Sequence, residues 1–226
     1  MTTMGCAMNK IKTICGCFCL AILLSSAFSE ECATMSGKVL LPTVKKEGGM
    51  PLMEALSKRQ SIREYDYSKA ISEEMLSELL WATCGVNRPD GKRTAGSTLN
   101  KQAVSVYVVV EKGIYLYLPQ ENALELVCEG DFRAQTGMQP FVKAAALNLV
   151  FVGDVQKLGI DDAAHNMLML GVDAGLMSQN TYLYCASKGL GTVVRGSIDG
   201  VAFAKLIKLP SHKKVLLAQT VSWPKE

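Results

Sequence analysis

The stretch from Asp161 to Lys188, "DDAAHNMLMLGVDAGLMSQNTYLYCASK", constrains the fold more than any other part of the chain. Its spacing predicts one long helix closed by Gly189, because a glycine just past the last turn readily takes the left-handed conformation of a helix cap. The helix is apolar on nearly every side, and a helix of that kind must be enclosed all round. In a chain of 226 residues we expect a second subunit to supply part of the enclosure.

Helix and strand signals are mixed along the rest of the chain. A short helix is predicted from Pro51 to near Arg59, and a second one begins at Ser72, whose hydroxyl can cap it. Strands are predicted at four places: 104–110, 113–119, 146–154 and the final "KVLLAQTVS". The first two should form a hairpin across the short step "EKG". Without a regular alternation of strands and helices, the pattern favours an α+β fold over a doubly wound sheet.

Composition narrows the class of protein. A chain of this length supports one substantial domain with its own core. Apolar residues make up 49% and charged residues 20% of the chain, which is typical of a soluble globular protein. The net charge is only +3, and no basic stripe is interleaved with aromatic residues. We therefore expect no nucleic-acid partner.

The first residues have the features of an export leader. Lys10 and Lys12 precede the apolar run "ICGCFCLAILLSSAF", and Ser25 and Ala27 are small residues at the spacing of a signal peptidase site. The run falls short of the roughly twenty residues needed to span a bilayer. We predict a signal peptide over residues 1–29, export to the periplasm, and no stable membrane insertion after cleavage. A cytoplasmic protein with a misread leader is the alternative.

The predicted leader sets the remaining boundaries. Residues 30–49 carry glycines, lysines and a proline without any period, and they are interpreted as an extended lead-in. The folded domain then covers residues 50–226. No internal repeat and no low-complexity tract interrupts it, which agrees with one domain.

The cysteines and histidines indicate no metal site. Four cysteines fall in the leader, and the mature chain keeps Cys32, Cys84, Cys128 and Cys185. Neither these four nor the two histidines, His165 and His212, have the spacing of a tetrahedral ligand set. Four cysteines in an exported protein could form disulfides, but the sequence leaves the pairing open.

Two arginines and a serine alternate in "SKRQSIREY", Ser57 to Tyr65. In an extended segment Arg59, Ser61 and Arg63 would point to one side, because successive side chains of a strand alternate. Guanidinium groups suit phosphate through paired donors, and a hydroxyl adds a further donor. Ordinary surface ion pairs are the competing interpretation of each arginine taken alone.

Two other polar groups are far away in sequence. Ser97, Asn100 and Gln102 occur in the loop "NRPDGKRTAGSTLNKQ", where serine and asparagine also serve as turn formers. The third group is the turn at Arg195 and Gly196, inside "GLGTVVRG". That stretch is not a dinucleotide fingerprint, which needs a strand before it and a helix after it, whereas here a helix precedes it.

Taken together, these motifs resemble the FMN-dependent nitroreductase family. "SKRQSIREY", "TAGSTLNKQ", "DAGLMSQNTYLYCASKGLGT" and the ending "VLLAQTVSWPKE" occur in the order and spacing of that family, over residues 50–226. The phrases "LLWATCGVN" and "GIYLYLPQENALELVCEGD" are similar to its subgroup related to azoline dehydrogenases of peptide biosynthesis. Four motifs in one chain are far more specific than any one of them.

The resemblance implies bound FMN. It assigns these residues to cofactor binding: Arg59, Gln60, Ser61, Arg63, Ser97, Asn100, Gln102, Val194, Arg195 and Gly196. Arg59, Ser61 and Arg63 match the segment at the phosphate and ribityl chain, with Gln60 between them. Ser97 and Asn100 match the serine and asparagine at the ribityl chain and the ring edge. The turn at 194–196 matches the segment whose backbone faces flavin N5. No separate catalytic residue and no metal is implied, because flavin N5 carries the hydride.

The fold implied by the resemblance is an antiparallel sheet flanked by helices, in an intertwined homodimer with FMN at the interface. The implied activity is hydride transfer to a small acceptor such as a nitroaromatic, a quinone or an enone-like compound. Two alternatives stay open: a flavin dehydrogenase that oxidises an azoline-like substrate, and a flavin-binding dimer without turnover. NAD(P)H is the possible donor, although an exported enzyme would need another one.

Overall fold

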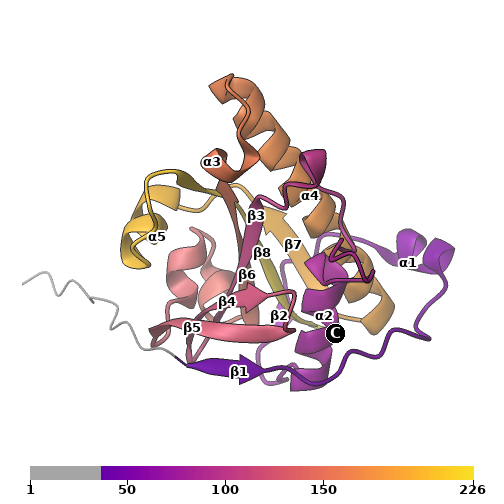
Figure 1. Cartoon of the computed structure of the whole chain (residues 1–226). Helices are drawn as coiled ribbons and strands as arrows, with labels where there is room; N and C mark the ends of the chain where they lie inside the picture. Colours follow the sequence, from indigo (N-terminus) through magenta and orange to yellow (C-terminus); the bar gives the residue numbers. More distant parts are fainter. Residues whose placement is uncertain (1–36) are drawn as a thin grey trace, which may run out of the picture. The chain divides into compact units, whose positions relative to one another are not determined.

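The structure is a computed structural model that describes residues 37–226 (Figure 1). The predicted leader and the first part of the lead-in lie outside the described residues. The elements run in this order: β1 (Lys38–Leu40), α1 (Leu52–Lys58), β2 (Tyr65–Asp66), α2 (Glu73–Cys84), the 3-10 turn η1 (Thr98–Asn100), β3 (Val104–Val110), β4 (Gly113–Leu118), β5 (Ala123–Glu129), η2 (Arg133–Thr136), η3 (Pro140–Lys143), β6 (Leu147–Asp154), α3 (Val155–Leu158), α4 (Ala163–Lys188), β7 (Gly191–Arg195), α5 (Gly200–Leu206) and β8 (Lys213–Pro224).

The strands form one antiparallel sheet in the order β1-β5-β4-β3-β6-β8-β2, and β7 pairs with β8 outside this path. The four predicted strands are confirmed as β3, β4, β6 and β8, and β3 and β4 form the predicted hairpin. The lead-in is not structureless throughout, because Val39 of β1 pairs with Leu124 of β5. This small strand covers the edge that β5 would otherwise expose.

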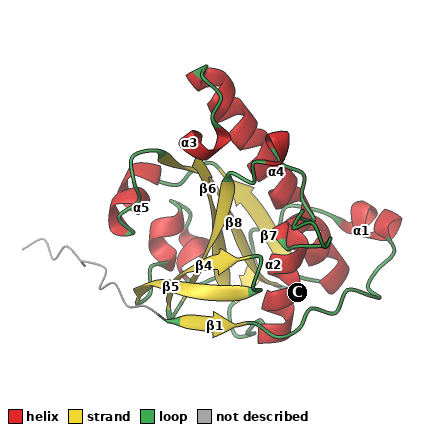
Figure 2. Cartoon of the chain, viewed as in Figure 1, coloured by secondary structure: helices red, strands yellow, loops and turns green. Residues whose placement is uncertain are grey.

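Helices cover both faces of the sheet, as Figure 2 shows with helices in red and strands in yellow. The alternation along β6 separates the two layers: Leu149 and Phe151 pack into the core under α2 and α4, whereas Val150 and Val152 pack with Phe203 of α5. A strand buried on both faces has no polar side, which explains why β6 is apolar over nearly its whole length. The predicted α+β class is confirmed.

The predicted helix signals are also confirmed at their ends. The Ser72 hydroxyl accepts a hydrogen bond from Met75 N at 3.2 Å and caps α2. Further along the chain Asp162 caps α4, and Gly189 closes this helix with φ +71° while its N–H donates to Cys185 O. Such caps satisfy backbone groups that the helix itself leaves unpaired.

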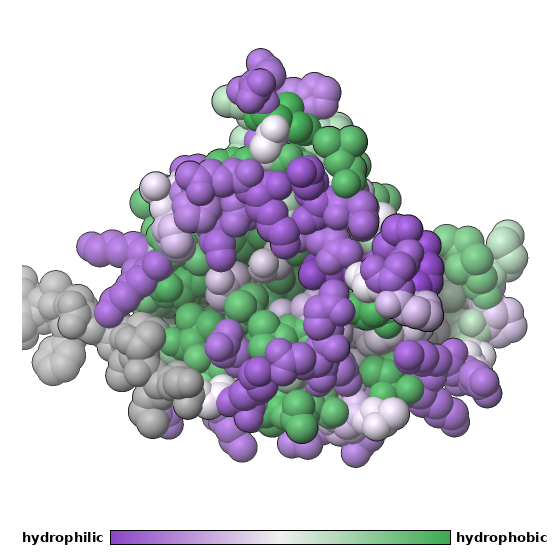
Figure 3. All heavy atoms as spheres, in the orientation of Figure 1, coloured by the Kyte–Doolittle hydropathy of each residue, from purple (hydrophilic) through white to green (hydrophobic). Residues whose placement is uncertain are grey.

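The described chain does not enclose α4 on every side. Leu170, Ala174 and Met177 are buried, but Leu168, Val172 and Leu176 on the opposite side are exposed by 61%, 44% and 46%. In Figure 3 apolar residues reach the surface at the upper end, over α4, and on the right, over α1. Among the described helices none combines the length and the hydropathy of a bilayer-spanning segment. The expected cover for α4 is therefore not supplied by residues 37–226 themselves.

Candidate active site

Residues 59–63, the 59–63 arm, lie along the free edge of β7. Ile62 N donates to Thr192 O at 3.0 Å, and the Tyr65 hydroxyl donates to Ile62 O at 2.6 Å. Gly191 makes this close approach possible, because a Cβ there would come within 3.0 Å of the Ile62 side chain. Gly191 therefore allows the 59–63 arm of the same chain to pack closely against β7.

Tyr182 of α4 connects the 59–63 arm with the end of β7. Its hydroxyl oxygen lies 2.8 Å from Ser61 Oγ and accepts a hydrogen bond from Val194 N at 3.0 Å. The Arg59 guanidinium lies 5.3 Å from the centre of the Tyr182 ring, a cation–π distance. Two of the three predicted site segments are therefore brought together.

The arm offers positive charge that the chain does not neutralise. Arg59 is half-buried and Arg63 is exposed. In the part of the chain that the structure describes, neither arginine belongs to an ion pair. Gln60 and Ser61 are exposed beside them. Because guanidinium and hydroxyl donors suit phosphate, the arm fits the phosphate end of the implied FMN.

Arg195, the third predicted arginine, is placed differently. Its side chain is only 6% exposed, and its guanidinium donates to Thr136 O at 2.8 Å and to Asn148 Oδ1 at 3.1 Å. Burial lowers the pKa of Arg195 to about 10. The side chain cannot serve a surface ligand, so only its backbone stays a candidate for cofactor contact.

Gly196, next in the chain, has the opposite environment. It is exposed, and a Cβ built on it would meet no atom within 4 Å. A flat ring can therefore approach the backbone at this point. This open position follows directly after the buried Arg195 and fits the implied flavin.

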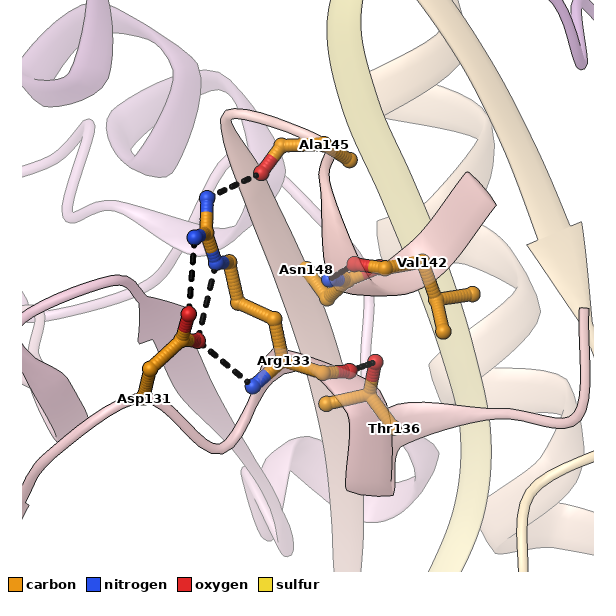
Figure 4. A network of polar contacts seen from close by, with 6 residues as sticks. All are labelled: Asp131, Arg133, Thr136, Val142, Ala145 and Asn148. Carbon is orange, nitrogen blue, oxygen red and sulfur yellow. Dashed lines mark hydrogen bonds and ion pairs between the residues drawn. The ribbon is translucent and has the colours of Figure 1, made fainter. Parts of the chain in front are cut away.

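A segment between β5 and β6, residues 131–146, stands beside this turn and is held by the network in Figure 4. The Arg133 guanidinium forms two hydrogen bonds to Asp131 and donates to Ala145 O at 3.0 Å. Asn148 Nδ2 donates to Val142 O at 2.9 Å. Met138 N donates to Ser197 O at 3.2 Å. The 131–146 segment is thereby fixed against the end of β7.

The loop with Ser97, Asn100 and Gln102 is anchored from α4. Asp173 is 1% exposed, and its carboxylate accepts hydrogen bonds from Thr98 N at 2.9 and 3.0 Å and from Thr98 Oγ1 at 2.9 Å. The Ser97 hydroxyl accepts from Gln102 N at 2.8 Å. Asn100 and Gln102 have φ values of +52° and +48°. Such left-handed backbone in residues other than glycine is often found at functional sites.

This loop and the 59–63 arm do not meet within one chain. Asp173 and Tyr182, which hold them, are nine residues apart on α4. Nine residues correspond to about two and a half helical turns and about 14 Å along the axis. The two side chains therefore leave the helix on opposite faces. The structure brings the arm and the β7 turn together, but it places the loop on the other side of α4.

The sequence did not predict the roles of Tyr182 and Asp173. Both lie in a helix whose general apolar character suggested packing alone. The available signal was their polarity, since a buried hydroxyl or carboxylate nearly always has hydrogen-bond partners. Which partners these are depends on segments distant in sequence.

The structure gives the state of three of the four cysteines outside the predicted leader. Cys84 and Cys185 are free and buried, and burial raises the pKa of the Cys84 thiol to about 12. Cys128 is disulfide-bonded, and Cys32 lies outside the described residues. Cys185 is 0% exposed and lies beneath the 59–63 arm, where it lines a small cavity with Gln60, Ile62 and Tyr182.

The model of the nitroreductase family matches residues 56–223 of this chain. Two of the similar proteins that carry the name putative nitroreductase come from Ralstonia eutropha and Methanocaldococcus jannaschii. The one from Ralstonia eutropha is a solved structure with 39% identity that covers 84% of this chain and 90% of its own, at a TM-score of 0.79. The one from Methanocaldococcus jannaschii is 25% identical over 190 residues, which are 80% of this chain and 94% of the relative.

A third relative is a solved structure named NADPH:FMN oxidoreductase, from Vibrio harveyi, in complex with NAD+. It is 26% identical, covers 77% of this chain and 69% of its own, and has a TM-score of 0.58.

The chain belongs to the nitroreductase family. The family and the fold predicted from the sequence are thereby confirmed. So is the predicted class of enzyme, a flavin-dependent oxidoreductase that uses FMN.

Proposed function

We propose that the protein uses FMN to transfer hydride to a small acceptor such as a nitroaromatic, a quinone or an enone-like compound. The observation that carries the proposal is the 59–63 arm, whose two arginines lack ion pairs in the described chain and which is fastened beside the open backbone at Gly196. A cationic end and an open flat end are what an FMN molecule needs. The oxidoreductase name of the Vibrio harveyi relative gives further support.

Each segment has a separate task in this proposal. Arg59, Ser61 and Arg63 hold the phosphate with charged and neutral donors. The backbone at Gly196 supports the ring, while Tyr182 and the 131–146 segment keep that backbone in place. FMN itself supplies the chemistry by taking and giving hydride at N5. The chain binds and orients FMN and excludes water from it, and no acidic or basic side chain is required for the transfer.

We infer that the enzyme is an intertwined homodimer with FMN at the interface. Ser97, Asn100 and Gln102 lie on the face of α4 opposite the 59–63 arm, so the loop of one subunit would complete the site of the other. The exposed stripe on α4 also suits a helix of a second copy. Gly171 and Gly175 lie on it with open space above them, beside the exposed Leu168, Val172 and Leu176.

The dimer is tested by placing a charge on the stripe. We expect Val172→Glu to give monomers in sedimentation and to abolish FMN retention, because obligate interfaces commonly bury more than about 2,000 Å². Val201→Glu is the matched control, since Val201 is 83% exposed on α5. A wild-type monomer that keeps FMN at micromolar concentration would contradict this inference.

We propose NAD(P)H as the donor, supported by the NAD+ complex of the Vibrio harveyi relative. The test is anaerobic mixing of the purified full chain with NADH or NADPH, followed by addition of each acceptor. Bleaching of the flavin and its recovery with an acceptor is the expected result. Oxidation of an azoline substrate without a nicotinamide donor would favour the dehydrogenase subgroup. A flavin that dithionite alone can bleach would favour a binding protein without turnover.

As the alternative to a cytoplasmic enzyme that NAD(P)H reduces, we propose that the protein is exported, with its mature chain beginning near residue 30 and its flavin reduced by another donor. The leader features support this, and so does the disulfide at Cys128, since disulfides persist mainly in oxidising compartments. Mass spectrometry of the protein from separated cell fractions tests it. An intact leader in the cytoplasmic fraction would support the cytoplasmic alternative.

A further inference from the structure

The hydroxyl of Tyr182 lies where two parts of the candidate site meet. Tyr182 is 6% exposed, so its hydroxyl has to find partners inside the protein. It has two, Ser61 Oγ at 2.8 Å and Val194 N at 3.0 Å. One group belongs to the 59–63 arm and the other to the strand that ends at Gly196.

The hydrogen-bond inventory gives this contact a direction. The Tyr182 oxygen accepts from the Val194 N–H, which leaves its single proton free to point at Ser61 Oγ. If Ser61 accepts that proton, its own proton is free to point outward. The exposed Ser61 hydroxyl would then be a donor aimed at a ligand.

The same contact fixes the edge of β7. This strand pairs with β8 along one side only. On its other side Thr192 O accepts from Ile62 N, and Val194 N donates to Tyr182. The arm and the strand are therefore joined at two points, one made by the backbone and one by the tyrosine hydroxyl.

We propose that Tyr182 is a positioning residue that presents the Ser61 hydroxyl to the flavin phosphate and ties it to the β7 edge. The inference rests on the proposed FMN site. Tyr182 acts through Ser61, so the effect of losing its hydroxyl should depend on the phosphate of the ligand. Riboflavin, which lacks that phosphate, is the comparison ligand.

The experiment titrates the flavin-free full chain with FMN and with riboflavin. Tyr182→Phe keeps the ring under Arg59 and removes only the hydroxyl. Tyr184→Phe is the matched control: it is the same change on the same helix, but its hydroxyl donates to Met75 O at 3.1 Å and serves the packing of α2. Ser61→Ala and the double variant with Tyr182→Phe complete a cycle, and the exposed Ser61 carries little risk for folding.

We expect Tyr182→Phe to reduce the preference for FMN over riboflavin by about tenfold. Ser61→Ala should reduce it equally, and the double variant no further. Tyr184→Phe should lower the melting temperature and leave the preference unchanged. A wild-type preference in Tyr182→Phe, or effects that multiply in the double variant, would overturn the inference. A wild-type chain that binds neither flavin would overturn the proposed function as well, so the two failures can be told apart.

Discussion

Arginines occur in two regions of this protein under opposite conditions. In the 59–63 arm, Arg59 is half-buried against the Tyr182 ring and Arg63 is exposed, and neither forms an ion pair with any described residue. At the 131–146 segment, Arg133 and Arg195 donate to carbonyl, carboxylate and amide oxygens of the chain itself. The residue type alone therefore does not identify a binding arginine. What matters is whether the fold has already used its donors.

Loss of the Arg195 side chain should reduce the stability of the fold most. Arg195→Ala should lower the free energy of unfolding by about 3 kcal/mol, because it removes a buried side chain and leaves Thr136 O without its donor. Chemical denaturation of the flavin-free protein measures this. Arg195→Lys should recover only part of the loss, since an ammonium group cannot replace a planar fork. An Arg195→Ala variant of wild-type stability that has lost FMN would mean that the side chain binds the ligand after all.

At Arg63 we expect a loss of FMN binding without a loss of stability. Arg63→Ala should weaken FMN binding by roughly ten- to a hundredfold, because it removes a charge-assisted contact. The melting temperature of the flavin-free variant should stay at the wild-type value, because the Arg63 side chain is exposed and forms no ion pair in the described chain. Lys214→Ala removes an equal charge from an exposed position on β8 and should change neither property. If Arg59→Ala and Arg63→Ala both retain stoichiometric FMN after gel filtration, the arm is not the phosphate site.

Gly137 and Gly196 offer a second comparison between a packed position and an open one. A Cβ on Gly137 would collide with the Arg195 guanidinium, so Gly137→Ala should destabilise the fold by about 1–3 kcal/mol. A Cβ on Gly196 meets no atom within 4 Å. Gly196→Ala should therefore leave stability intact and weaken FMN binding at the open backbone. Melting curves and FMN titrations on both variants check this, and exchanged phenotypes would contradict our placement of the flavin.

Sequence patterns predicted those parts of the fold that depend on local signals. The Ser72 and Gly189 caps, the hairpin of β3 and β4 and the length of α4 follow from turn chemistry and periodicity. β5 was missed because Glu125 and Glu129 interrupt its apolar run, and pairing with β1 and β4 decides its conformation. β7 was interpreted as part of a turn because Gly191 begins it, whereas that glycine allows Ile62 to pack closely.

Some features of the candidate site could likewise be predicted from the sequence, and others could not. The alternating arm was visible in the sequence because its residues are neighbours, and the family resemblance supplied the other segments. The burial of Arg195 was not visible, because its partners Thr136 and Asn148 lie 59 and 47 residues away. For the same reason no local pattern revealed that Tyr182 joins Ser61 to Val194. Sequence reasoning therefore found the candidate residues but could not separate ligand contacts from internal ones.

The smallest effect is expected at the rim of the 131–146 segment, where Asp131 pairs with Arg133 at 2.8 Å. The hydrogen bonds from Arg133 hold the pKa of the Asp131 carboxyl below its ordinary value. A carboxyl whose pKa is lower in the folded state stabilises the fold at pH values above its unfolded pKa, which is about 3.9. That stabilisation disappears as the pH falls through the folded pKa.

Asp131→Asn should therefore cost less than about 1 kcal/mol at pH 7, because the Asp131 side chain is 45% exposed and solvent screens the pair. The difference from wild type should shrink in 1 M salt and disappear as the pH falls through the folded pKa of Asp131. Denaturation curves at several pH values measure it. A loss as large as that of Arg195→Ala would show that the exposed end of the network is as essential as its buried end, and the distinction between the two ends would fail.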